Sequence, residues 1–181
     1  MVPVFYEVLA DYMTPIRMFQ ALRKEGTPCF MLESVENKDQ WGRYSFIGIN
    51  PKSEIKISGK ELEVDGVKQE EEFKMSYLSD LIEKYKSPVM EDYPKLTGGL
   101  IGYFGYDMIR QVEKKLTNVP EDDLEMPECH LCMYDEISAF DHLANKAVII
   151  QNIHKGDNIK QKYEELEDKA ELILHKMERP V

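Results

Sequence analysis

Polar and apolar residues follow two different periods along this chain, and the changes between them outline its elements. Apolar residues that alternate with polar ones indicate strands, whereas apolar residues three or four positions apart indicate helices. Alternation at 43–50 and 54–58, together with short apolar and aromatic runs elsewhere, predicts strands at 4–9, 29–33, 43–50, 54–58, 98–106, 129–140 and 146–153, and two short strands on either side of Asp65-Gly66. The sequence predicts helices that begin near residues 15, 77, 107 and 159.

Local signals sharpen several of these boundaries. Thr14 followed by a proline is typical of a helix start, because the hydroxyl caps free N–H groups and proline suits the first helical position. Gly26 is expected to cap the end of that helix. Asp65-Gly66 between alternating residues predicts a tight hairpin turn in which both residues have positive φ. Asp157 is predicted to cap the start of the last helix.

The order of the elements predicts an α+β fold of mainly antiparallel strands with interspersed helices. Strands 129–140 and 146–153 are expected to pair through a turn near His142. The chain shows no internal repeat and no low-complexity segment. Its 181 residues are enough for a sizeable core, so residues 1–181 are interpreted as one region.

Composition argues against several classes of function. The net charge of −11 makes attraction to nucleic acid or to an anionic membrane surface unfavourable, so neither partner is expected. No apolar stretch is long enough to cross a bilayer, and the N-terminus lacks the pattern of a signal peptide. The three cysteines cannot form a complete set of disulfides, so we expect a cytoplasmic protein with reduced thiols.

The closest approach to a metal site is Cys129-His130-Leu131-Cys132, which has the spacing of half a zinc site or of a redox dithiol. A structural zinc needs four ligands, and the sequence offers no second pair. In a strand, Cys129 and Cys132 would also project to opposite faces. We therefore interpret them as buried thiols and expect no metal or cofactor in this chain.

Two other features favour structural explanations. The glycine-aromatic segment 98–106 leads into a predicted helix, but it matches neither a dinucleotide-binding fingerprint nor a P-loop. Close packing of the backbone explains its glycines better. The carboxylate runs 70–72 and 121–123 fall in predicted loops, where a solvated acidic surface is more plausible than acid–base chemistry or Mg²⁺ binding.

One corner of the predicted sheet does combine groups that suit a ligand. Glu33-Ser34 closes one strand, and Arg43-Tyr44-Ser45 opens the next. A carboxylate can bind an ammonium group, while hydroxyl and guanidinium groups can bind a carboxylate, so this set suits a zwitterion. The alternative is that these polar groups only cap the strand ends.

The same residues belong to a set of motifs that spans nearly the whole chain. They are Pro3-Val4-Phe5-Tyr6-Glu7-Val8-Leu9-Ala10-Asp11 before Thr14-Pro15, Leu32-Glu33-Ser34, Gly42-Arg43-Tyr44-Ser45-Phe46-Ile47-Gly48, and Gly98-Gly99-Leu100-Ile101-Gly102-Tyr103-Phe104-Gly105-Tyr106-Asp107. Any one of them would be weak evidence. In this order, the set resembles the N-terminal region of anthranilate synthase component I, a family of chorismate-using enzymes.

The resemblance implies a complete subunit more than twice as long, whose chorismate- and Mg²⁺-binding residues lie in a C-terminal region outside these 181 residues. We therefore expect a fragment of a lyase of tryptophan biosynthesis that is not catalytic alone. The parent enzyme would need Mg²⁺ and would make anthranilate from chorismate and ammonia. Its expected partners are its own C-terminal region and a separate glutamine amidotransferase subunit, component II, which supplies the ammonia.

The resemblance also implies a role in feedback inhibition, since this region of the family helps to bind L-tryptophan away from chorismate. It assigns Glu33 and Ser34 to that site, and Arg43, Tyr44 and Ser45 as further contacts. Three alternatives stay open. They are the N-terminal part of aminodeoxychorismate synthase component I of the folate pathway, a stand-alone amino-acid-binding module, and a scaffold without a ligand.

Overall fold

The computed structural model describes residues 1–11, 13–33, 42–113, 115–116 and 125–178. The chain divides into two compact units, and each is assembled from segments that are separate in the sequence. The first unit consists of Met1–Pro51, Ser87–Gly98 and Tyr134–Val181, and the second of Lys52–Lys86 and Gly99–Met133. Each unit has an antiparallel sheet of its own, which confirms the predicted α+β class.

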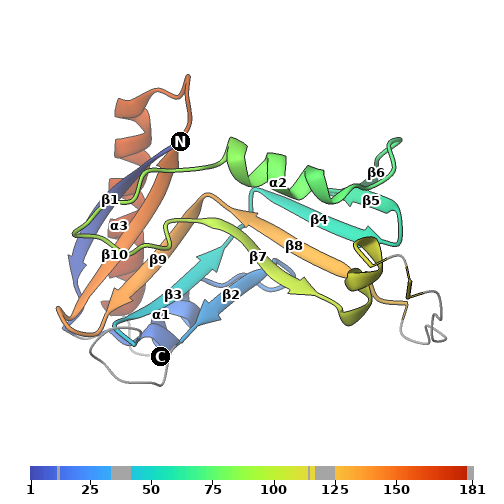
Figure 1. Ribbon diagram of the computed structural model, residues 1–181. Helices are drawn as coiled ribbons and strands as arrows, with labels where there is room; N and C mark the ends of the chain where they lie inside the picture. The colour runs from blue at the N-terminus through green and yellow to red at the C-terminus, as the bar shows by residue number, and fades with distance from the viewer. Residues whose placement is uncertain (12, 34–41, 114, 117–124, 179–181) are drawn as a thin grey trace. The chain divides into compact units, whose positions relative to one another are not determined.

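The first unit is built on a five-stranded sheet in the order β1-β10-β9-β3-β2, in which every neighbouring pair is antiparallel (Figure 1). The strands are β1 (Val2–Leu9), β2 (Cys29–Leu32), β3 (Tyr44–Ile49), β9 (Glu136–Asp141) and β10 (Lys146–Ile153). The pairing of β3 with β9 joins distant parts of the sequence. It brings the predicted ligand corner beside the turn that connects β9 to β10.

Two helices, α1 (Pro15–Leu22) and α3 (Ile159–Glu178), pack on one face of this sheet. Alternate strand residues such as Ile47 and Ile149 project towards them. The helices contribute Met18, Leu22, Leu166, Ala170 and Ile173 to the same core. The start of α1 is as predicted, because the Thr14 hydroxyl accepts a hydrogen bond from the Arg17 N–H at 3.3 Å.

The opposite face of the sheet carries the segment 87–98. The rings of Phe5 in β1 and Tyr93 in this segment are stacked, with their centroids 3.9 Å apart. Asn152 in β10 is 3% exposed, and its side-chain N–H groups donate to the carbonyl oxygens of Thr97 at 2.7 Å and Asp135 at 3.1 Å. These contacts hold the segment against the first unit's own sheet.

The second unit has a five-stranded sheet in the order β6-β5-β4-β8-β7, antiparallel from β6 to β8. Its elements are β4 (Ser53–Ser58), β5 (Glu61–Val64), β6 (Val67–Lys68), α2 (Met75–Lys84), β7 (Gly99–Phe104), the 3₁₀ helix η1 (Tyr106–Gln111) and β8 (Cys129–Tyr134). Its core contains Ile55, Ile57, Leu62, Phe73, Leu78, Met108, Cys129 and Leu131. Asp65 (φ 52°) and Gly66 (φ 78°) form the predicted turn between β5 and β6.

Four predicted details are wrong. Helix α1 ends at Leu22, before Gly26, whose positive φ serves a later turn. The helix predicted from residue 107 is the short 3₁₀ helix η1. At α3, Asn158 accepts the N–H of Gln161, while Asp157 accepts that of His154. The strand predicted at 129–140 is divided at Asp135, because β8 and β9 belong to different sheets.

Among the helices of the described residues, none combines the length and the apolar character needed to span a bilayer.

Candidate functional site

The predicted ligand corner lies in the first unit, where the end of β2 meets the beginning of β3. The two strands pair antiparallel, with Leu32 opposite Phe46, so the residues after β2 lie near those that precede β3. Glu33 directly follows β2 and is exposed to solvent. Ser34 lies outside the described residues.

Arg43 at the start of β3 is bound to Asp141, the last residue of β9. Its Nε lies 3.1 Å from Oδ1 and 3.2 Å from Oδ2, and its Nη2 lies 2.7 Å from Oδ2. The Asp141 residue is 4% exposed, whereas the Arg43 side chain is 41% exposed. The pair therefore presents one edge of the guanidinium group to solvent and buries the carboxylate.

Tyr44 places an aromatic ring beside this ion pair. The Arg43 Cζ atom lies 4.9 Å from the centroid of the Tyr44 ring, which is within the range of a cation–π contact. The Tyr44 ring also lies 5.9 Å from that of Phe46, the next residue on the same face of β3. Burial, and then the negative charge of Asp141, raise the pKa of the Tyr44 phenol, so the phenol is neutral at physiological pH. The result is a neutral aromatic ring with a cation over it.

Ser45 belongs to the opposite face of the sheet. It is fully buried, and its hydroxyl lies 2.8 Å from Nε2 of His142, with which it shares a hydrogen bond. The backbone N–H of His142 donates to the carbonyl of Arg43 at 2.9 Å. The cation–π contact groups Arg43 with Tyr44, whereas alternation along β3 places Ser45 on the face opposite to Tyr44.

Asp141 and His142 are the two neighbours that the sequence analysis missed. A turn near His142 was predicted and is confirmed between β9 and β10. Its position next to β3 depends on pairing across 97 and 98 positions of sequence. The signal in the sequence was an aspartate and a histidine directly after the predicted strand 129–140, since both residue types commonly bind polar side chains such as those of Arg43 and Ser45.

The cysteines that the sequence offered as candidates lie in environments that indicate packing roles. Cys129 packs in the core of the second unit beside Leu131, whereas Cys132 alternates to the other face of β8. Burial raises the pKa of Cys129 to about 11. Cys29, Cys129 and Cys132 form no disulfide bond with one another. Within the part of the chain that the structure describes, no group of three or more His, Cys, Asp or Glu side chains could hold a metal ion.

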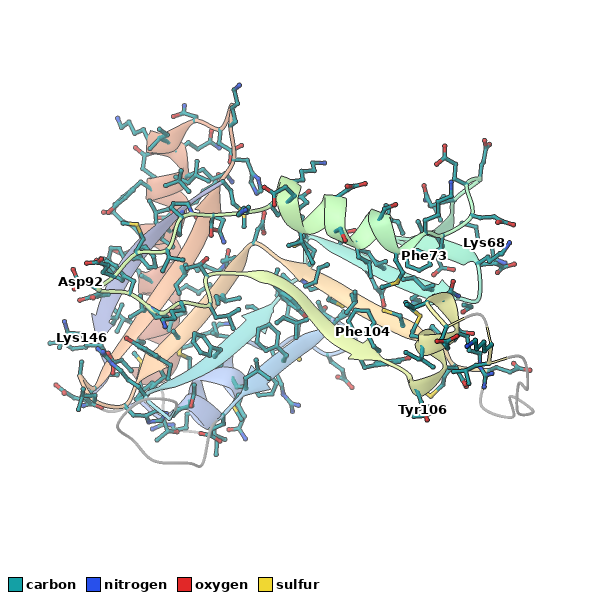
Figure 2. All side chains as sticks on the ribbon, in the orientation of Figure 1. Lys68, Phe73, Asp92, Phe104, Tyr106 and Lys146 are labelled. Carbon is teal, nitrogen blue, oxygen red and sulfur yellow. The ribbon has the colours of Figure 1, made fainter. Side chains whose placement is uncertain are left out.

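The carboxylate run 70–72 is an exposed loop, as predicted, and the run 121–123 lies outside the described residues. An open cleft of about 500 Å³ in the second unit has this loop at its rim. Its lining includes Phe73, Tyr77, Glu70, Glu71, Glu72 and Asp80. Figure 2 shows Phe73 of this cleft in the second unit. In the glycine-aromatic segment, Phe104 and Tyr106 are also labelled there, and Tyr106 is 92% exposed.

Comparison with known proteins relates these features to a family. A family model described as chorismate binding enzyme matches residues 15–180. Anthranilate synthase component 1 of Acetivibrio thermocellus is 40% identical over 182 residues, which cover 95% of this chain and 35% of the relative. Anthranilate synthase component 1 of Pseudomonas aeruginosa is 31% identical over 186 residues, which cover 99% of this chain and 37% of the relative.

A solved structure shares the fold. The crystal structure of anthranilate synthase component I from Streptococcus pneumoniae TIGR4 matches with a TM-score of 0.61 and 26% identity. The match covers 96% of this chain and 37% of that chain. The chain therefore spans a little over a third of the length of the relatives it matches. Because the family model matches nearly its whole length, the chain belongs to the chorismate-binding enzyme family, and its relatives include anthranilate synthase component I.

Proposed function

We propose that this chain is the N-terminal, regulatory portion of an anthranilate synthase component I and contributes to feedback binding of L-tryptophan. The observation that carries the proposal is the similarity to anthranilate synthase component 1 over 95% of the chain, together with the coverage of only 35% of that relative. The relatives named above favour anthranilate synthesis over the aminodeoxychorismate alternative. In the parent enzyme, chorismate and ammonia would give anthranilate.

The chemistry of the ligand corner supports tryptophan as the effector. Tyr44 and Phe46 offer two neighbouring aromatic rings for contact with an indole ring, and Arg43 offers a cation over the Tyr44 ring. Exposed Glu33 offers a carboxylate for an ammonium group. Ser34 and Ser45 belong to the set assigned by the family motif, but Ser45 is fully buried and bonded to His142 on the other face of β3, so it would support the strand without contacting the ligand. A zwitterionic aromatic amino acid has all three complementary groups.

Regulation through this corner follows from differential binding. Tryptophan that contacts this chain and the remainder of the parent subunit would favour one arrangement of the two over another. A coupling free energy of about 1–3 kcal/mol would weaken chorismate binding by roughly five- to 150-fold. The effect needs no contact between tryptophan and chorismate.

The proposal leaves catalysis to the rest of the parent enzyme. The described residues contain no group of three or more His, Cys, Asp or Glu side chains that could hold the Mg²⁺ of the parent. A glutamine amidotransferase subunit would supply ammonia to the parent enzyme. The 181-residue chain is therefore expected to show no synthase activity with chorismate and ammonium.

The proposal is tested by titrating L-tryptophan into this chain and recording amide NMR spectra, with L-phenylalanine as the control. Saturable shifts around Glu33, Ser34 and Arg43 with tryptophan alone are expected if the half-site is preformed. If no shifts occur up to millimolar tryptophan, the titration is repeated on the complete polypeptide that carries this sequence. Absence of binding there as well would contradict the proposal.

A substitution in the complete polypeptide gives a second test. Ser34→Phe adds bulk to the predicted site and should relieve inhibition by tryptophan without changing uninhibited turnover. Ser79→Phe, at an exposed residue of α2 in the second unit and outside the family motifs, is the control and should leave inhibition unchanged. Full tryptophan sensitivity of Ser34→Phe would show that the site is assigned wrongly.

A further inference from the structure

Asp141 lies at the end of β9, on the face of the sheet that also carries Tyr44, yet it belongs to none of the family motifs. We propose that Asp141 is a positioning residue of the amino-acid site, and that it acts by holding the Arg43 guanidinium against the Tyr44 ring. This inference rests on the proposed function. It extends the site by a residue 98 positions away from Arg43.

The contact between Arg43 and Asp141 has a geometry that fixes the guanidinium group. Both Asp141 oxygens are engaged, and they take the Nε–H and an Nη2–H of Arg43. Two parallel hydrogen bonds fix the plane of a guanidinium group, which a single contact does not. The third nitrogen, Nη1, is not used by Asp141 and keeps its donors for a ligand.

Asp141 is itself held in place by the turn that follows β9. Its Oδ1 also accepts the backbone N–H groups of Leu143 at 3.0 Å and Ala144 at 3.1 Å. Burial by itself raises the pKa of Asp141, but the hydrogen bonds from Arg43, Ala144 and Leu143 outweigh it and lower the pKa below its ordinary value. The carboxylate is therefore ionised at neutral pH and attached to the rigid turn between β9 and β10.

Without the contact to Asp141, the guanidinium group of Arg43 would not be fixed in one orientation. Its side chain is 41% exposed, so an unheld guanidinium group would sample many rotamers in solvent. Held by Asp141, its Cζ atom stays 4.9 Å from the Tyr44 ring centroid. A ligand then meets a cation and an aromatic face that are already arranged, and loses less conformational entropy on binding.

The same turn also contacts the other face of β3. The His142 ring shares a hydrogen bond with the Ser45 hydroxyl, and its backbone N–H donates to the Arg43 carbonyl. These contacts fix the backbone of β3 at the corner. Asp141 is the member of the turn that acts on a side chain of the proposed ligand surface.

The experiment uses Asp141→Asn in the complete polypeptide, together with its glutamine amidotransferase partner. Asparagine keeps an oxygen for the N–H groups of Leu143 and Ala144 but removes the charge that holds Arg43. Because charge-assisted hydrogen bonds are lost, we expect the tryptophan concentration for half-maximal inhibition to rise by about tenfold or more. The kcat and KM for chorismate without tryptophan should stay within about twofold of the wild type, since Arg43 and Asp141 are proposed to bind the inhibitor and not chorismate.

A double-mutant cycle distinguishes positioning from a general structural role. Arg43→Gln should also weaken inhibition, and adding Asp141→Asn to it should change inhibition by less than about twofold, because the two residues act as one unit. Glu136→Gln is the matched control. It makes the same acid-to-amide change on β9 but breaks the ion pair with Lys169 on the helix-covered face. This control should retain wild-type sensitivity.

Wild-type sensitivity of Asp141→Asn, or fully additive effects with Arg43→Gln, would overturn the proposal. If Asp141→Asn yields too little folded protein, the partly exposed Arg43→Gln reports on the same contact, and its wild-type sensitivity would also overturn it. A wild-type enzyme insensitive to tryptophan would instead contradict the proposed function. If Ser34→Phe is resistant while Asp141→Asn stays sensitive, only the positioning role of Asp141 fails.

Discussion

Gly102 in β7 lies directly against the backbone of His130 in the neighbouring strand β8. A Cβ atom at position 102 would overlap the His130 carbonyl oxygen and would lie 2.9 Å from the Leu131 Cα atom. Backbone atoms inside a sheet cannot move aside as a flexible side chain can. This packing explains a glycine in the glycine-aromatic segment without a ligand.

Gly102→Ala should therefore destabilise the protein. Overpacking at this site is expected to lower the free energy of unfolding by about 1–3 kcal/mol, measured by urea denaturation. Phe104→Thr is the control, because Phe104 is exposed on the same strand and threonine is a good strand former. An alanine variant as stable as the wild type would contradict the close approach of the two strands.

Asn152 offers a test of buried hydrogen bonding. Its side-chain N–H groups donate to the Thr97 and Asp135 carbonyl oxygens, so Asn152→Asp would place a carboxylate against two acceptors. The variant should lose about 3 kcal/mol or more of unfolding free energy at pH 7. The pKa of the new carboxyl should be raised in the folded state, so the loss should shrink at pH 4, where protonation restores one donor.

Asn158→Asp is the control for this substitution. Asn158 accepts the N–H of Gln161 at the start of α3, and an aspartate there is an equally good N-cap. Its unfolding free energy should stay within about 0.5 kcal/mol of the wild type at both pH values. Equal destabilisation by the two variants would contradict the role assigned to Asn152.

The ionised Asp141 should make the unfolding free energy of the protein depend on pH. Its pKa is lowered in the folded state, whereas an unfolded aspartate titrates near pH 3.9. The stabilisation by its ionised form is therefore complete well above pH 4 and is lost as the pH falls through the lowered pKa. Chemical denaturation of the wild type and of Asp141→Asn at several pH values measures this contribution.

The difference in unfolding free energy between these two proteins should be largest at neutral pH and should shrink towards pH 3. Other carboxylates, including Glu54, whose pKa is also lowered on balance, are common to both proteins and cancel in the difference. A difference that does not change with pH would contradict an ionised Asp141 bound to Arg43.

The buried thiol of Cys129 is expected to react slowly with alkylating reagents. Burial raises its pKa to about 11, so at pH 8 roughly one molecule in a thousand carries the thiolate. Cys29 is only partly buried and should react first with iodoacetamide, as followed by mass spectrometry of peptides. Urea should make the two thiols react alike, and labelling of folded Cys129 as fast as Cys29 would contradict its burial.

Much of the fold could be predicted from local patterns. Runs of apolar residues located the strands near Val2–Leu9 and Lys146–Ile153, and the Asp65-Gly66 signal located a turn. Apolar residues three or four positions apart predicted the helix that begins near residue 159, and Leu166, Ala170 and Ile173 of α3 are buried. These predictions succeeded because each depends on the steric and hydrophobic preferences of neighbouring residues.

Patterns of the same kind failed where a strand passes from one sheet to another. Residues 129–140 form one largely apolar run, because β8 and β9 are both buried on both faces over most of their length. Only the pairing of β8 with β4 and of β9 with β3 reveals the division at Asp135. An apolar run indicates that a strand is buried and does not indicate which sheet buries it.

The candidate site shows the same limit. The sequence by itself determined that Glu33 follows one strand and that Arg43, Tyr44 and Ser45 open another. Only the tertiary structure decided that Arg43 binds Asp141, that Tyr44 lies beside that pair, and that Ser45 faces His142 on the other side. These partners are 97 or 98 positions apart, and the order of strands in a sheet depends on the burial of whole faces, which local preferences do not encode.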